Sequence, residues 1–324
     1  MTTKIKTGII GAAGYTGGEL TRLLLGHPAV EIGFAQSRSQ AGKPLWLVHG
    51  DLLGDTDMLF SSGHTQDADV IFLCLAHGEA KKFLAENHFA ATTKIIDLSH
   101  DFRLHDREHD FVYGLPELQR GKINAAVHIA NPGCFATAIQ LALLPAAAAG
   151  LLQSDIHISA TTGSTGAGQS LSPSTHYSWR NGNISAYKAL HHQHLAEIGQ
   201  SLEYLQPGFS QQVHFIPYRG SFTRGILAGV YFDYAGDFDA LLEIYRSYYL
   251  PHPFTFLSGQ PVDIKQVVNT NKCLLHIEQQ GEKIFVTSVI DNLLKGASGQ
   301  AVQNMNLAFG LEETLGLKLK AVAF

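Results

Sequence analysis

The first third of the chain alternates short apolar runs with amphipathic stretches. Ile5–Ile10 is short, apolar and rich in β-branched residues, which is typical of a strand buried on both faces of a parallel sheet. The next stretch places Leu20, Leu23 and Leu24 on one helical face and ends at Gly26. Further short apolar runs cover residues 30–35, 70–75 and 94–98. Strands that alternate with helices indicate βαβ units, so we expect an α/β fold with a Rossmann-type, doubly wound parallel sheet.

The pattern changes after residue 134. The apolar run at 136–144 predicts a helix, with Pro145 near its end. Later apolar stretches are longer, several alternate with polar residues, and few helices separate them. These stretches cover residues 157–162, 212–216, 226–234, 262–268, 273–279 and 283–290. With one predicted helix at Phe238–Tyr249, they indicate an α+β domain with a mostly antiparallel sheet.

The length of 324 residues allows two domains. A last predicted helix, at about 299–309, is expected to pack back on the first domain. We therefore predict a dinucleotide-binding domain made of residues 1–133 and 299–324, and a second domain made of residues 134–298.

Composition narrows the class of protein. Apolar residues make up 45% of the chain and charged residues 16%, as in a globular protein, and a net charge of −5 disfavours a nucleic-acid partner. Three cysteines are too few for a disulfide framework and favour a reducing compartment. The first residues lack the apolar core of a signal peptide, and no apolar run approaches ~18 residues. We expect a cytoplasmic protein without a membrane partner.

A glycine-rich turn follows the first strand. Its spacing, Gly-x-x-Gly-x-x-Gly, lets the chain turn tightly and brings a pyrophosphate close to the backbone at a helix start. The alternative is a glycine turn without a ligand. We predict that the dinucleotide is contacted by Gly11, Gly14, Tyr15, Thr16 and Gly17.

The end of the second strand indicates which dinucleotide is bound. NAD sites usually place a carboxylate there, but this segment carries Ser37, Arg38 and Ser39 instead. An arginine between two serines can bind a 2′-phosphate through charge-assisted hydrogen bonds. The segment therefore favours NADP over NAD, although a solvated surface arginine remains the alternative.

Cys134 stands in Asn-Pro-Gly-Cys, at the entrance to the apolar helix. The positive end of a helix dipole lowers the pKa of a thiol, and the Pro-Gly turn can expose the sulfur. Cys74 and Cys273 lie in apolar strand-like segments and are expected to be small buried side chains. We predict that Cys134 is a nucleophile.

A nucleophilic thiol needs a proton acceptor, and the densest candidates lie at residues 191–197. On a helix, His194 shares a face with Glu197, which could orient the imidazole; His192 is the second candidate base. A zinc site is the competing interpretation, but neither His-Glu-x-x-His nor a cysteine pair is present.

A second glycine-rich segment, Gly163–Gly168, follows another strand. Successive N–H groups with the Ser164 hydroxyl could form an anion nest for a substrate phosphate at Gly166 and Gly168, although a plain flexible loop is the alternative. The cations that could assist are Arg103, Arg180, Lys188 and Arg224.

Taken together, these segments resemble the N-acetyl-γ-glutamyl-phosphate reductase family of the semialdehyde dehydrogenase group. The cysteine turn and the last block, in this order, are highly specific. The resemblance runs nearly end to end and is carried by Gly11-Ala-Ala-Gly-Tyr-Thr-Gly-Gly-Glu-Leu, Ser37-Arg38, Asp97-Leu-Ser-His-Asp-Phe-Arg-Leu, Asn131-Pro-Gly-Cys134, Gly163-Ser-Thr-Gly-Ala-Gly168, His192-Gln-His194-Leu-Ala-Glu197-Ile, Arg224-Gly-Ile226 and Ile290-Asp-Asn292-Leu-Leu-Lys-Gly296-Ala-Ser-Gly-Gln-Ala-Val-Gln303-Asn-Met-Asn306.

The resemblance implies reduction of N-acyl-γ-glutamyl phosphate by NADPH, through a Cys134 thioester, in arginine biosynthesis. It implies that Asn292 helps to place the cofactor and that Arg103 and the loop 163–168 hold the leaving phosphate. It also implies that His192 or His194 acts as the acid, and that the second domain is catalytic and forms a dimer or tetramer.

The chain departs from the family pattern around the substrate. The family usually has arginine at Gln193, proline at Ala196, a cation at Gln169, histidine at Tyr218, and Tyr-Pro at Phe135-Ala136. The acyl group therefore stays open, and a succinyl carboxylate meeting Arg180 is one alternative to acetyl. An enzyme acting on aminoadipyl or aspartyl phosphate, and a non-enzymatic NADP sensor, are the other competing interpretations.

Overall fold

The computed structural model describes residues 4–323, which fall into two compact units. Unit 1 contains the chain up to Pro132 and the segment Ala297–Lys318, and unit 2 contains Gly133–Gly296 and the chain from Leu319 onward. The sequence expectation assigned this C-terminal tail to the first domain. Instead, the Val322 N–H donates to the Val268 carbonyl at 3.2 Å, which attaches the tail to unit 2.

Unit 1 is built on one parallel sheet with the strand order β2-β1-β3-β4-β6-β5, so the predicted Rossmann-type sheet is confirmed. Ile10 lies opposite Gln36 on one side and Leu73 on the other, and Leu73 lies opposite Asp97. The carboxyl ends of four strands therefore meet at one edge of the sheet. The strands are β1 (Ile5–Ile10), β2 (Val30–Gln36), β3 (Val70–Leu73), β4 (Lys94–Asp97), β5 (Val112–Tyr113) and β6 (His128–Ala130).

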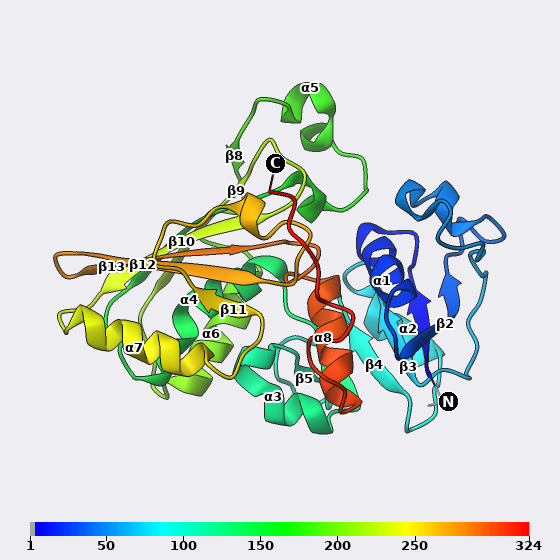
Figure 1. Cartoon of the computed structure of the whole chain (residues 1–324), viewed down its shortest axis with the longest axis horizontal. Helices are drawn as coiled ribbons and strands as arrows, with labels where there is room; N and C mark the ends of the chain where they lie inside the picture. Colours follow the sequence, from blue (N-terminus) through cyan, green and yellow to red (C-terminus); the bar gives the residue numbers. More distant parts are fainter. Residues whose placement is uncertain (1–3, 324) are drawn as a thin grey trace. The chain divides into compact units, whose positions relative to one another are not determined.

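Helices cover both faces of this sheet. The last helix returns from the far end of the sequence to lie beside α1 and α3, where the Ser298 hydroxyl donates to the Thr16 carbonyl (Figure 1). On the other face, Ala80 of α2 packs with Ile71 and Leu73. The helices are α1 (Tyr15–Leu25), α2 (Glu79–Glu86), α3 (Pro116–Ala125) and α8 (Ser298–Ala308), and two 3₁₀ turns cover Leu45–Leu47 and Gly50–Leu52.

Unit 2 contains a seven-stranded sheet in the order β11-β12-β13-β10-β7-β9-β8. Only the pairs β11–β12 and β7–β9 are parallel, which confirms the prediction of a mostly antiparallel sheet. The strands are β7 (Ile156–Thr162), β8 (Ser185–Ala186), β9 (Val213–Arg219), β10 (Ile226–Asp233), β11 (Thr255–Leu257), β12 (Cys273–Gln280) and β13 (Lys283–Ile290).

One predicted strand of this domain is wrong. Residues 262–268 contain a 3₁₀ turn, Ile264–Gln266, in place of a strand. The Asp263 carboxylate accepts the Lys265 N–H, and the Gln266 side chain accepts the Asp263 N–H. This reciprocal capping outweighs the β-branched composition that suggested a strand.

Three helices of unit 2, α4, α6 and α7, lie along one face of the sheet (Figure 1). Helix α4 continues through Pro145, which the sequence placed near its end. Proline cannot donate to the Leu141 carbonyl one turn back, and the Tyr249 hydroxyl donates to that carbonyl in its place. The helices are α4 (Cys134–Ala148), α5 (Tyr177–Arg180), α6 (His194–Leu205) and α7 (Phe238–Tyr249), and shorter 3₁₀ turns cover Ser164–Ala167 and Pro173–Thr175.

Candidate active site

The glycine-rich turn of unit 1 connects β1 to α1. Gly11 has a positive φ of 80°, and a Cβ there would lie 2.5 Å from the Cys74 carbonyl oxygen. At Gly17 a Cβ would lie 2.6 Å from the Ala12 backbone, whereas at Gly14 the nearest atom is 3.8 Å away. Two of the three glycines are therefore required by close backbone contacts. Tyr15 begins α1, so the N–H groups of the first helical turn face the end of the sheet.

A pocket of about 360 Å³ opens at this edge of the sheet. It brings together four of the nine predicted cofactor residues, Gly11, Ser37, Arg38 and Ser39; Gly14, Tyr15, Thr16 and Gly17 do not line it. Sequence reasoning missed the opposite wall, because the residues of α2 carry no dinucleotide motif. The full lining is Ile10, Gly11, Gln36, Ser37, Arg38, Ser39, Leu75, Glu79, Lys82, Phe83 and Glu86.

Cys134 is the first residue of α4, as predicted, and Gly133 is the N-cap. The Gly133 N–H donates to Glu197 Oε2 at 2.9 Å, while Glu197 Oε1 lies 3.8 Å from His194 Nε2. One buried carboxylate on α6 therefore contacts both the cysteine turn and an imidazole. Glu197 therefore anchors the cysteine turn, and its role in orienting an imidazole stays a prediction.

The two predicted histidines are packed together in an aromatic cluster of unit 2. The ring centroids of His192 and His194 are 4.6 Å apart, and both rings meet Phe135, the residue after the cysteine, edge on. Phe215 closes the cluster at 5.3 Å from His192. Cys134 and the histidines thus belong to one locality, since Phe135 is fixed by the same helix that begins at Cys134.

Burial and, after it, the neighbouring Lys188 charge lower the pKa of His192 to about 4. His192 is therefore neutral at pH 7. Helix α6 begins only at His194, so His191 and His192 lie in the connection before it. The connection that leads to it is strained: Lys188 and Leu190 have positive φ values of 45° and 65°.

Tyr187 and Arg219 complete this locality, and sequence reasoning missed both. Burial and, after it, the charge of the Cys134 thiolate raise the pKa of Tyr187 to about 12, an interaction that requires the hydroxyl to lie near the sulfur. The Arg219 guanidinium lies over the Tyr187 ring, 4.7 Å from its centroid. Neither residue stands in a recognisable motif; the only signal was the position of Tyr187 just before the histidine segment.

The second glycine-rich loop differs from the anion nest that the sequence suggested. The N–H groups of Gly163, Ser164 and Thr165 donate to the carbonyls of residues 225, 222 and 223. Those of Gly166 and Gly168 donate within the loop itself. Since these donors are used by the backbone, the nest expectation is corrected, and only the half-buried Ser164 hydroxyl is left to meet a substrate phosphate.

Arg180, expected at the substrate, is turned to the backbone. It is 7% exposed, and its guanidinium donates to the carbonyls of Ser174, Arg219 and Gly220 and to the Ser185 hydroxyl. Arg180 therefore clamps the segment before β8 to the end of β9. The observation that suggested a succinyl carboxylate no longer supports that alternative.

Arg224 and Asn292 also have structural partners within unit 2. Arg224 Nε donates to the fully buried Asp291 carboxylate at 3.1 Å. The Asn292 side chain accepts the Gly225 N–H at 2.8 Å and donates to the Thr165 hydroxyl at 3.0 Å. These contacts hold the loops 163–168 and 222–225 together. The side chains of Arg224 and Asn292 therefore stabilise these loops.

Arg103 supports the backbone of unit 1. Its Nε donates to the Asn131 carbonyl at 2.9 Å and its Nη2 to the Leu98 carbonyl at 3.0 Å. Asn131 in turn donates to the Ala297 carbonyl. Arg103 thus braces the turn that leads into Pro132, which is a positioning role distinct from the predicted phosphate contact.

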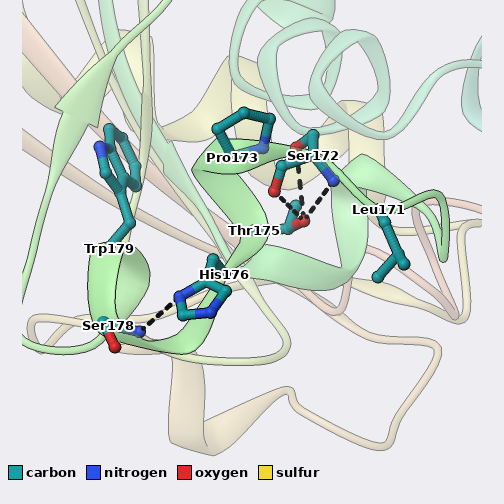
Figure 2. A pocket seen from close by; sticks show the side chains of 7 residues that line it. All are labelled: Leu171, Ser172, Pro173, Thr175, His176, Ser178 and Trp179. Carbon is teal, nitrogen blue, oxygen red and sulfur yellow. Dashed lines mark hydrogen bonds between the residues drawn. The ribbon is translucent and has the colours of Figure 1, made fainter.

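A larger cavity, of about 730 Å³, lies on the segment around α5. Figure 2 shows its seven lining side chains, with His176 accepting the Ser178 N–H and Ser172 bonded to Thr175. None of the predicted site residues lines it. Size alone therefore does not mark the reactive site of this protein.

Within residues 4–323, no group of three or more His, Cys, Asp and Glu side chains is arranged to hold a metal ion. Nor is any helix in that range long and apolar enough to cross a membrane.

Two family models match the chain. Residues 6–126 match the semialdehyde dehydrogenase NAD-binding domain, and residues 134–292 match the semialdehyde dehydrogenase dimerisation domain. The first unit thus has the domain that binds a nicotinamide cofactor in these enzymes.

Full-length relatives are similar at high identity. The chain is 56% identical over 320 residues to the N-acetyl-γ-glutamyl-phosphate reductase of Christiangramia forsetii and 57% identical over 321 residues to that of Parabacteroides distasonis. Each alignment covers 99% of this chain and the whole relative. Among solved structures, aspartate semialdehyde dehydrogenase II of Vibrio cholerae shares the fold, with a TM-score of 0.72 at 17% identity over 95% of this chain and 99% of that one.

Proposed function

Because the chain belongs to the N-acetyl-γ-glutamyl-phosphate reductase family, we propose that it reduces N-acetyl-γ-glutamyl phosphate to N-acetyl-glutamate 5-semialdehyde and phosphate, with NADPH, in arginine biosynthesis. The observation that carries this proposal is Cys134 at the start of α4, with its turn bonded to Glu197 and its neighbour Phe135 packed on two buried histidines. A reactive cysteine with an oriented imidazole is the arrangement that acyl transfer through a thioester requires.

In the first step, the Cys134 thiolate attacks the acyl carbon, the C–S bond forms, and the C–O bond to phosphate breaks. Phosphate leaves with the bonding electrons and a thioester remains. The positive end of α4 favours both the thiolate and the developing oxyanion. Serine would be a poor substitute, since its alkoxide is rarely formed at neutral pH and leaves less readily.

In the second step the thioester carbon is reduced; the nicotinamide cofactor that unit 1 would hold would supply the hydride. The resulting alkoxide takes a proton from an imidazole and returns it as the C–S bond breaks, so that aldehyde and thiolate are released. We assign this proton to His194, because the Glu197 carboxylate 3.8 Å away stabilises its imidazolium form. The neutral His192 then serves as a hydrogen-bonding neighbour.

NADPH is proposed as the reductant because Ser37, Arg38 and Ser39 follow β2 where NAD-binding domains usually carry a carboxylate. We further propose that the protein works in the cytoplasm as a homodimer or homotetramer. The match of residues 134–292 to a dimerisation domain supports the assembly.

The direct test is the reverse reaction, with purified protein, N-acetyl-glutamate 5-semialdehyde, phosphate and NADP⁺. We expect NADPH formation that requires phosphate and saturates with the semialdehyde. Absence of turnover with this semialdehyde would overturn the proposal. N-succinyl-glutamate semialdehyde and aspartate semialdehyde are assayed in parallel. Preference for the first would indicate a succinyl group in place of acetyl, and preference for the second an aspartyl substrate in place of a glutamyl one.

A further inference from the structure

The cofactor pocket of unit 1 has two walls of different origin. One wall comes from the strand ends, with Gly11 after β1 and residues 37–39 after β2. The other wall is one face of helix α2, where Glu79, Lys82 and Phe83 line the same pocket. A ligand phosphate beside Arg38 therefore faces α2 as well.

Helical spacing explains why α2 presents these residues together. Positions 79, 82, 83 and 86 are three, four and seven residues apart and share one face of the helix. Phe83 anchors that face, because it packs against the buried cluster that contains Ile71 and Leu73. Lys82 is held by this anchor at the rim of the pocket, with its ammonium exposed.

The two cations of the pocket form no ion pair with its two carboxylates. Glu79 and Glu86 stand three and four residues from Lys82, spacings at which helical side chains can pair. Across residues 4–323, however, no hydrogen bond or ion pair is found for Lys82, and none is found for Arg38. Both side chains are exposed and line the same pocket of about 360 Å³.

We propose that Lys82 is a second determinant of cofactor specificity, which binds the 2′-phosphate of NADPH together with Arg38; the inference rests on the proposed function. A 2′-phosphate carries nearly two negative charges, and two unpaired cations from opposite walls match it. NADH has only a hydroxyl at that position, so Lys82 contributes little to its binding.

The test compares Lys82→Ala with Lys81→Ala, its neighbour on the same helix. Lys81 is also exposed but lies over the Phe102 ring and does not line the pocket. Calorimetric titration measures the binding of 2′,5′-ADP and 5′-AMP to each full-length variant, without any need for catalysis. We expect Lys82→Ala to weaken 2′,5′-ADP binding about tenfold and to change 5′-AMP binding much less. Lys81→Ala should match the wild type, and Arg38→Ala should show a loss at least as large as that of Lys82→Ala.

Equal 2′,5′-ADP affinity in Lys82→Ala and wild type would overturn the inference. So would an equal loss for both ligands, since that would indicate a general effect on the pocket. If wild-type protein binds both ligands equally, the NADP assignment fails together with the inference. If it prefers 2′,5′-ADP but never reduces the acyl phosphate, the proposed function fails while the role of Lys82 stands.

Discussion

The two glycine-rich turns of the molecule look alike in sequence but have different structural roles. Each follows a buried strand and carries three glycines. The turn Gly11–Gly17 leads into an eleven-residue helix and lines an open pocket. The turn Gly163–Gly168 itself contains a four-residue 3₁₀ turn, Ser164–Ala167, and donates its N–H groups to neighbouring carbonyls.

The same contrast extends to the charges around each turn. Arg38 and Lys82 stand exposed at the first turn, whereas Arg180 and Arg224 are bonded to backbone carbonyls or to Asp291 in unit 2. A glycine pattern therefore predicts that some group approaches the backbone closely, but it does not predict whether that group is a ligand or another part of the chain. At the first turn we propose that the partner is a ligand; at the second turn the partner is the chain itself.

The strongest test of this contrast is Gly17→Ala against Gly14→Ala. A Cβ at Gly17 would lie 2.6–2.7 Å from three backbone atoms of Ala12, which cannot move aside as a side chain can. We expect Gly17→Ala to lose about 3 kcal/mol of unfolding free energy and most NADPH affinity. Gly14→Ala, with open space around its Cβ, should be mild. Thermal unfolding and NADPH titration measure both; equal behaviour of the two variants would contradict the account.

Asn292→Ala sharpens the contrast at the second turn. The substitution leaves the Gly225 N–H without its acceptor and removes a donor from Thr165, so we expect a loss of about 2 kcal/mol in unfolding free energy. NADPH affinity should stay within about twofold of wild type. A large loss of NADPH affinity without loss of stability would restore the sequence interpretation of Asn292 as a cofactor ligand.

The pH dependence of stability tests whether His192, beside the cysteine turn, is buried away from water. The pKa of His192 lies near 4 in the folded protein against 6.5 for an ordinary histidine. The unfolded chain therefore binds the proton first, so the contribution of His192 is complete above pH 6.5 and is lost as the pH falls toward 4.

Between pH 7 and pH 5, wild type should lose about 1 to 2 kcal/mol more unfolding free energy than His192→Gln. Other titrating groups, such as the buried Asp97, are present in both proteins and cancel in the difference. His191→Gln, which removes an exposed neighbour, serves as the control. Parallel pH curves for wild type and His192→Gln would contradict the burial argument.

Sequence patterns predicted the elements whose signals are local. The strand Ile5–Ile10 and the helix Phe238–Tyr249 match their predicted bounds, because apolar spacing over a few residues determines which face is buried. Cys134 at a helix start was predictable for the same reason. The failed strand at 262–268 shows the limit: local capping by Asp263 competed with composition.

The roles of the arginines depend on distant partners and could not be predicted. Arg180 meets a carbonyl 39 residues away, and Arg224 meets a carboxylate 67 residues away. Tyr187 was missed because its closeness to Cys134 arises only when β8, β9 and α6 are assembled. The sequence therefore identified the charged side chains that could bind a ligand, but not which of them form hydrogen bonds or ion pairs within the folded chain.

The central claim, a thioester on Cys134, has one direct measurement. Wild-type protein is mixed with N-acetyl-γ-glutamyl phosphate in the absence of NADPH, quenched in acid, and examined by mass spectrometry of the intact chain and its peptides. We predict one N-acetylglutamyl adduct, on the peptide that contains Cys134, retained in Cys74→Ala and absent in Cys134→Ala. Turnover of the same protein without any adduct, or an adduct that survives in Cys134→Ala, would contradict the account.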